Sequence, residues 1–119
     1  MPKKVLIADD DKSFRKILGM IVSKAGYEVV TAEDGEDAFE KACESRPDLV
    51  ISDATMPKLD GYQLFDKLRA NPETADVPFL LVTGHAQGDR PEIEASGYVS
   101  KPPSRAQLLE QISSLIGAA

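Results

Sequence analysis

The stretch KVLIADDD, residues 4–11, joins an almost wholly apolar run to three consecutive carboxylates. A short continuous apolar run is typical of a strand that is covered on both faces of a sheet. Asp9, Asp10 and Asp11 follow this run directly, and like charges held so close repel one another. The pattern predicts a buried first strand that ends at a polar site.

The same alternation of apolar runs and amphipathic segments continues along the chain. Apolar strands that alternate with amphipathic helices predict an α/β fold, with a parallel sheet wrapped on both faces. Between Thr83 and Tyr98, Gly88 and Pro91 allow at most a short helix. Strands are expected at 4–8, 27–32, 47–52, 77–83 and 98–100, and the clearer helices follow Asp11 and span 34–46, 60–70 and 104–117.

Length and composition narrow the class of protein. The 119 residues, 42% of them hydrophobic, suit one domain that spans residues 1–119. The net charge of -6 argues against direct nucleic acid binding, which needs a basic face. A single cysteine excludes an internal disulfide, and no stretch approaches the ~20 apolar residues of a membrane span. With no signal-peptide core after the start MPKK, we expect a cytoplasmic protein without membrane insertion.

Chemically useful side chains stand where the predicted strands end. In open parallel sheets, ligands bind in the crevice at the carboxyl ends of the strands. Taken singly, each residue has an ordinary structural explanation, but together they favour a functional site at one edge of the sheet. The residues are Asp9 and Asp10 after the first strand, Asp53 after the third, Thr83 at the end of the fourth and Lys101 after the fifth.

These residue types point to phosphoryl chemistry. Crowded carboxylates need a compensating cation, and hard carboxylate oxygens suit Mg²⁺. Lys101 could add a second positive charge and Thr83 a hydroxyl donor, which together would hold a phosphoryl group. Asp53, alone after the central strand, is the candidate nucleophile for an acyl phosphate.

With these motifs in their order, the chain resembles the receiver domain of two-component response regulators. The resemblance covers essentially the whole chain, through VLIADDD (5–11), PDLVISDATMPKLDGYQLF (47–65), VPFLLVTG (77–84) and YVSKP (98–102). It implies a doubly wound, flavodoxin-like sheet of five parallel strands in the order 2-1-3-4-5, with five flanking helices. Only 18 positions separate Thr83 from Lys101 (101 − 83), so we expect the fourth helix to be shortened.

The resemblance also implies roles for individual residues. Asp53 would be the phosphoacceptor, and Mg²⁺ would be held by Asp9, Asp10, Asp53 and the backbone carbonyl of Thr55. Thr83 would donate to one phosphoryl oxygen. Asp11 is interpreted differently, as the cap of the first helix.

Further roles concern the switch and its timing. The resemblance implies that Lys101 pairs with a phosphoryl oxygen, that its bond to Pro102 is cis, and that Tyr98 switches together with Thr83. Thr55 and His85 lie two positions beyond Asp53 and Thr83, where they could tune hydrolysis, although a solvated His85 is an equal alternative.

The predicted function is a phosphorylation switch rather than an enzyme, with at most slow self-dephosphorylation. A sensor histidine kinase or a histidine phosphotransfer protein would be the donor, and the downstream partner stays open. A haloacid-dehalogenase-like phosphatase is disfavoured because Thr55 stands where its second Asp is needed. A flavodoxin-like binding module would need a phosphate loop in place of DDDKS, and a pseudo-receiver would lack some of the site residues that are present.

Overall fold

The computed structural model of the protein describes residues 3–54, 56, 58–83, 97–100 and 104–117, and at 83 and 97–100 it describes the backbone. Strands and helices alternate along the chain, as the pattern predicted. The strands are β1 (Lys4–Ala8), β2 (Glu28–Ala32), β3 (Leu49–Asp53), β4 (Phe79–Thr83) and β5 (Gly97–Ser100), and the helices are α1 (Lys12–Lys24), α2 (Gly35–Ser45), α3 (Gly61–Ala70) and α4 (Arg105–Ile116).

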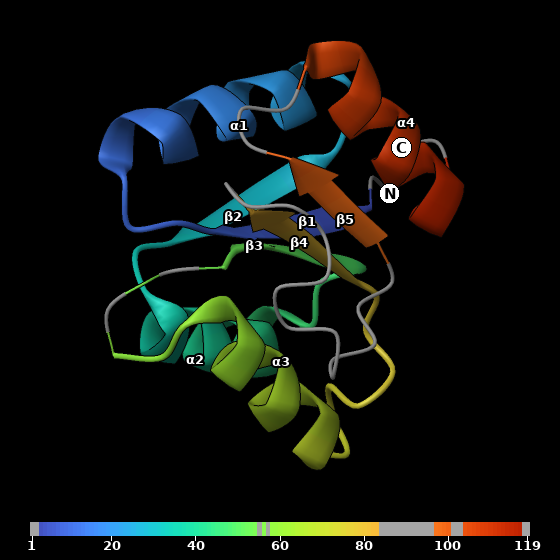
Figure 1. Ribbon diagram of the computed structural model, residues 1–119. Coiled ribbons are helices and arrows are strands. Elements are labelled where there is room, and N and C mark those ends of the chain that lie inside the picture. Colours follow the sequence, from blue (N-terminus) through green and yellow to red (C-terminus); the bar gives the residue numbers. More distant parts are fainter. Residues whose placement is uncertain (1–2, 55, 57, 84–96, 101–103, 118–119) are drawn as a thin grey trace.

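The five strands form one parallel sheet in the order β2-β1-β3-β4-β5, which confirms the predicted topology. Helices α1 and α4 cover one face of the sheet, and α2 and α3 cover the other (Figure 1). The helix expected between β4 and β5 falls at 84–96, outside the described residues. None of the helices in the described part of the chain combines the length and apolar character needed to cross a membrane.

The sheet divides the core into two apolar clusters. Successive side chains of a strand point to opposite faces, so each inner strand contributes to both clusters. Leu6 and Val50 pack with α2 and α3, while Ile7 and Ile51 pack with α1 and α4. Because both faces are covered, all four side chains are almost fully buried, which explains the continuous apolar runs at 5–8 in β1 and 49–51 in β3.

Side-chain caps fix the starts of the helices. Asp11 accepts hydrogen bonds from the backbone N–H groups of Ser13 (3.0 Å) and Phe14 (3.2 Å), which confirms its predicted role as a cap. Asp60 and Gln63 form a reciprocal capping box at α3. Ser104 caps α4.

Five strand boundaries differ from the prediction by one or two residues. β3 and β4 begin at Leu49 and Phe79 rather than at 47 and 77, β5 begins at Gly97 rather than at 98, and the start of β2 and the end of β3 also differ. β2 begins at Glu28 rather than Tyr27, because Tyr27 is buried in the core and its hydroxyl donates to the Gly117 carbonyl oxygen at 2.7 Å. β3 extends through Asp53 rather than ending at Ser52. The backbone N–H of Ala54 donates to the Val82 oxygen at 3.0 Å, which continues the ladder to the end of the strand.

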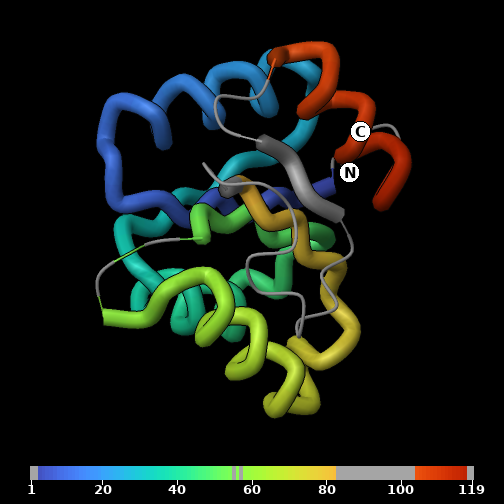
Figure 2. Tube along the Cα trace, viewed as in Figure 1, coloured from blue at the N-terminus to red at the C-terminus, as the bar shows by residue number. Residues whose placement is uncertain are grey.

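The two ends of the described chain meet at one edge of the molecule (Figure 2). Lys3 donates through Nζ to the carbonyl oxygen of Ile116, and its own carbonyl accepts from the Glu28 N–H at 2.9 Å. Together with the bond from Tyr27 to Gly117, these contacts tie the end of α4 to the beginning of the sheet.

Replacing Tyr27 with phenylalanine removes one buried hydrogen bond, and we expect it to lower the free energy of unfolding by about 1 kcal/mol. Burial raises the pKa of the Tyr27 hydroxyl above its ordinary value of 10.0. The unfolded chain therefore loses this proton first, and the advantage of the wild type shrinks as the pH rises above 10.0. Urea unfolding of both proteins between neutral pH and pH 11 measures this difference, and a difference that grows above pH 10 contradicts the prediction.

Candidate functional site

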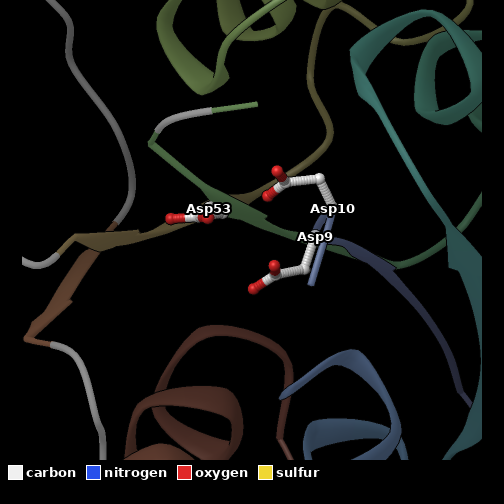
Figure 3. A group of neighbouring side chains, drawn as sticks. All are labelled: Asp9, Asp10 and Asp53. Atoms are coloured by element: carbon white, nitrogen blue, oxygen red, sulfur yellow. The ribbon is translucent and has the colours of Figure 1, made fainter. Parts of the chain in front are cut away.

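Three carboxylates meet at the carboxyl ends of two neighbouring strands. Asp9 and Asp10 follow β1, and Asp53 is the last residue of β3, whose Ser52 pairs with Ala8. One oxygen from each carboxylate lies within 4.8 Å of the other two. Their carboxylate groups point into the same region beyond the strand ends (Figure 3). The sequence-based prediction that these three residues come together is confirmed.

Two of these three residues are buried, so the repulsion between their carboxylates matters. Asp9 is 1% exposed and Asp53 is 8% exposed, whereas Asp10 is open to solvent. Carboxylates grouped this closely repel one another, and a cation among them removes that repulsion. Three carboxylate oxygens with one open side match the preference of Mg²⁺ for a few carboxylates and several waters. The arrangement can therefore hold a divalent cation within reach of Asp53.

The backbone around Asp9 is held by several hydrogen bonds. Its Oδ1 atom accepts from the Asp11 N–H at 2.9 Å, and its own N–H donates to the Ala32 oxygen at 3.1 Å. Arg15 donates through Nη1 to the Asp9 carbonyl oxygen at 2.7 Å. The sequence analysis missed Arg15, and the only available signal was a cation in the first turn of the helix that follows the acidic run.

Asp53 is fixed by the beginning of α3. Ser52 donates through Oγ to the Asp53 carbonyl oxygen at 2.9 Å, and the Gly61 N–H donates to the Ala54 oxygen at 2.9 Å. A Cβ atom placed on Gly61 would lie 2.4 Å from the Asp53 carbonyl oxygen, which is closer than atoms can approach. Only glycine lets α3 start this close to the site.

The loop after Asp53 is anchored to the start of α2. Lys58 adopts a left-handed conformation, with φ of 69°, and its Nζ lies 3.7 Å from Asp34 Oδ2 and 3.9 Å from Glu36 Oε2. Gly35 packs so closely on Leu59 that an added Cβ would lie 2.2 Å from the Leu59 carbonyl oxygen. The anchor restrains the loop next to the carboxylates, and no pattern in the sequence predicts it.

Of the other predicted site residues, the structure describes the backbone of Thr83 and Tyr98 alone. Thr83 ends β4 and pairs with Ser100 in β5, while Tyr98 pairs with Leu81; these statements concern the backbone. Asp53 pairs with Val82, so the ends of β3 and β4 lie side by side. Four further predicted residues lie outside the described residues: Thr55, His85, Lys101 and Pro102.

Comparisons with known proteins agree with this geometry. A family model described as the response regulator receiver domain matches residues 5–113. The chemotaxis protein CheY4 of Vibrio cholerae has a TM-score of 0.91 and 31% identity, with 97% of this chain and 99% of that chain covered. The receiver domain of the sensor histidine kinase PA1611 of Pseudomonas aeruginosa PAO1, solved with a magnesium ion coordinated in the active site cleft, has a TM-score of 0.91 and 26% identity, with 99% and 100% covered.

Similar sequences include both short and long proteins. The polar-differentiation response regulator DivK of Brucella anthropi is 33% identical over 123 residues, with 100% of both chains covered. The probable transcriptional regulator ycf27 of Cyanophora paradoxa is 42% identical over 120 residues, which cover 96% of this chain and 48% of that protein. The chain thus spans about half the length of the transcriptional regulators that it matches.

Proposed function

This chain belongs to the response regulator receiver domain family, and from that membership we propose that Asp53 accepts a phosphoryl group in two-component signalling. The observation that supports Asp53 most directly is its position, with a carboxylate oxygen within 4.8 Å of oxygens from both Asp9 and Asp10. Family membership also disfavours the flavodoxin-like module and the haloacid-dehalogenase-like phosphatase.

We propose that the phosphoryl donor is a phosphohistidine on a sensor histidine kinase or a histidine phosphotransfer protein. A carboxylate oxygen of Asp53 attacks phosphorus and forms a new O–P bond, while the P–N bond to the donor imidazole breaks. The electron pair of that bond stays on the imidazole nitrogen, which takes up one proton from solvent, so the donor returns to neutral histidine. Asp53 becomes an acyl phosphate, which can be hydrolysed by water.

Mg²⁺ is the cofactor that fits the three carboxylates best. Asp9 and Asp10 would hold it together with Asp53 and the backbone carbonyl of Thr55, and it would neutralise negative charge as the phosphoryl group approaches. The magnesium ion in the similar receiver domain of PA1611 supports this assignment. The three carboxylates offer only oxygen atoms, which are suited to such a hard cation.

The remaining residues are proposed in the roles that the family resemblance implies. Thr83 and Lys101 would contact phosphoryl oxygens, and Tyr98 would change its position together with Thr83. Thr55 and His85 would tune the rate of hydrolysis. The cis bond between Lys101 and Pro102 stays a prediction, as does each of these roles.

We propose that residues 1–119 act as one receiver and as a regulator rather than an enzyme, with at most slow self-dephosphorylation. A cytoplasmic location and the absence of direct nucleic acid binding remain predictions. Because the matched transcriptional regulators are about twice as long, our proposal concerns signal reception alone. Intact-mass measurement after incubation with acetyl phosphate tests it: one added phosphoryl group is expected with Mg²⁺ and none with excess chelator.

Replacing Asp10 with asparagine is expected to weaken Mg²⁺ binding by at least about tenfold, because it removes a charged oxygen ligand. Asp10 is exposed, so the fold should persist. Titration of amide chemical shifts with MgCl₂ measures the affinity directly.

Asp11→Asn is the matched control for this titration. It removes the same charge from the neighbouring residue, yet asparagine caps a helix as well as aspartate does. We expect Asp11→Asn to change Mg²⁺ affinity less than about threefold, through weak long-range electrostatics alone. An equal loss of affinity in the two variants would remove the distinction between ligand and cap.

A further inference from the structure

Helix α1 carries a positive charge in an otherwise acidic chain. Its 13 residues include Lys12, Arg15, Lys16 and Lys24 and no Asp or Glu, although the whole chain has a net charge of -6. Within the described part of the chain, none of these four cations forms an ion pair. Their charges are therefore available to an anionic partner.

These cations border a groove between α1 and the edge strand β2. The groove has a volume of about 630 Å³, within the usual range for binding pockets. Lys12, Lys16 and Lys24 line it along one side of the helix, and Val29 and Thr31 line it from the strand. Lys12 and Lys16 are four positions apart and Lys24 lies eight positions further on; because all three line the groove, the cations form a row beside it.

Gly19 leaves the floor of this groove open. It lies in the middle of α1, where glycine is less favourable than alanine. A Cβ atom added there would lie 3.8 Å from Val29 Cγ1, an ordinary contact, so packing within the fold does not require glycine. Next to Gly19, the side chain of Met20 is 51% exposed, which leaves apolar surface beside the row of cations.

We propose that the α1–β2 groove binds an acidic segment of a partner protein, with an apolar side chain over Gly19 and carboxylates beside the lysines. The charge of the groove is complementary to such a segment and opposite to that of the chain as a whole. Lys12 and Lys24 are separated along the helix by roughly 18 Å. That length corresponds to about five residues of extended polypeptide, so a peptide matches the row better than a single phosphate does.

This binding does not depend on phosphorylation of Asp53. The groove is lined by residues of α1 and β2, and its lining includes none of the three carboxylates of the site. Arg15 is the one lining residue that also contacts the site, through its bond to the Asp9 carbonyl oxygen. Failure of peptide binding would therefore not contradict the phosphoacceptor proposal. Failure of Asp53 phosphorylation would likewise not contradict the peptide-binding proposal.

Fluorescence anisotropy with the unphosphorylated full chain tests the proposal. The probe is a fluorescein-labelled octapeptide of alternating Glu and Leu. Saturable binding is expected, and the double variant Lys16→Glu/Lys24→Glu should weaken it by at least about tenfold. Lys67→Glu, a charge reversal at an exposed position of α3 on the other face of the sheet, should change it less than about twofold.

The variant Gly19→Leu tests whether peptide binding needs the open groove or only the charge of the helix. The leucine side chain fills the floor while keeping every cation, so peptide affinity should fall at least about tenfold and the melting temperature should stay equal or rise. Unchanged affinity in Gly19→Leu, or equal binding of an octapeptide of alternating Lys and Leu, would overturn the proposal. So would tighter binding of a fluorescein-labelled dT octanucleotide, because the groove would then recognise phosphate.

Discussion

Replacing Asp53 with asparagine abolishes phosphoryl uptake, with incorporation expected to fall by more than about 100-fold. The amide keeps the size of the side chain but removes the anionic oxygen that attacks phosphorus. Asp53 is the acidic residue at the end of β3, held between the Ser52 hydroxyl and the start of α3. The measurement is intact mass after incubation with acetyl phosphate and MgCl₂, followed by transfer from a phosphorylated kinase once a cognate donor is known.

Asp66→Asn is the matched control for this experiment. It makes the same chemical change at an exposed position of α3, so phosphoryl uptake should stay at the wild-type level. Circular dichroism of both variants should match the wild type. Uptake by Asp53→Asn at the level of Asp66→Asn would place the acceptor elsewhere in the chain.

Replacing Ile112 with alanine lowers the free energy of unfolding by about 2–5 kcal/mol, the usual cost of deleting a fully buried isoleucine. Ile112 is 0% exposed and belongs to the cluster between α4 and the sheet. The loss is a large fraction of the roughly 5–15 kcal/mol that stabilises a typical domain. Urea unfolding followed by far-ultraviolet circular dichroism measures it.

Ile17→Ala is the matched control, because it makes the same substitution within a helix. Ile17 lies in α1 and is 53% exposed, so removing the same atoms there should cost less than about 1 kcal/mol. Equal costs at the two positions would show that burial in the cluster is not the source of the stability.

Much of the fold was predictable because buried strands have a recognisable apolar sequence pattern. β1 is covered on both faces, so its residues after Lys4 are apolar without interruption, and its predicted bounds match the structure. Tyr27 shows the limit of this reasoning. Its aromatic ring suits a strand, but a hydroxyl bond to Gly117, 90 residues away, places it before β2 begins.

The candidate site was predictable where topology alone brings residues together. Once the strand order was inferred, Asp9, Asp10 and Asp53 had to share one edge of the sheet. Contacts that depend on side-chain reach were not predictable. The bond from Arg15 to the Asp9 carbonyl and the anchor at Lys58 are examples, because neither follows from a periodic pattern.

The basic groove was not predictable for a related reason. The sequence pattern predicts a helix after Asp11 but does not indicate which strand lies beside its cations. Lys16 and Lys24 look like ordinary solvated lysines until β2 is placed beside them. Likewise, the role of Gly19 in the floor of the groove can be inferred only once the position of Val29 is known.

The contact between Lys3 and the end of α4 has a consequence for protein engineering. Because the described chain starts and finishes at neighbouring points, a short linker could join Lys3 to Gly117 and new termini could be opened in a surface turn. A circularly permuted receiver of this kind would keep the sheet order while changing which element is synthesised first. The same proximity would let the whole unit be inserted into a loop of a host protein, as a phosphorylation-responsive module, without spreading the host's loop ends apart.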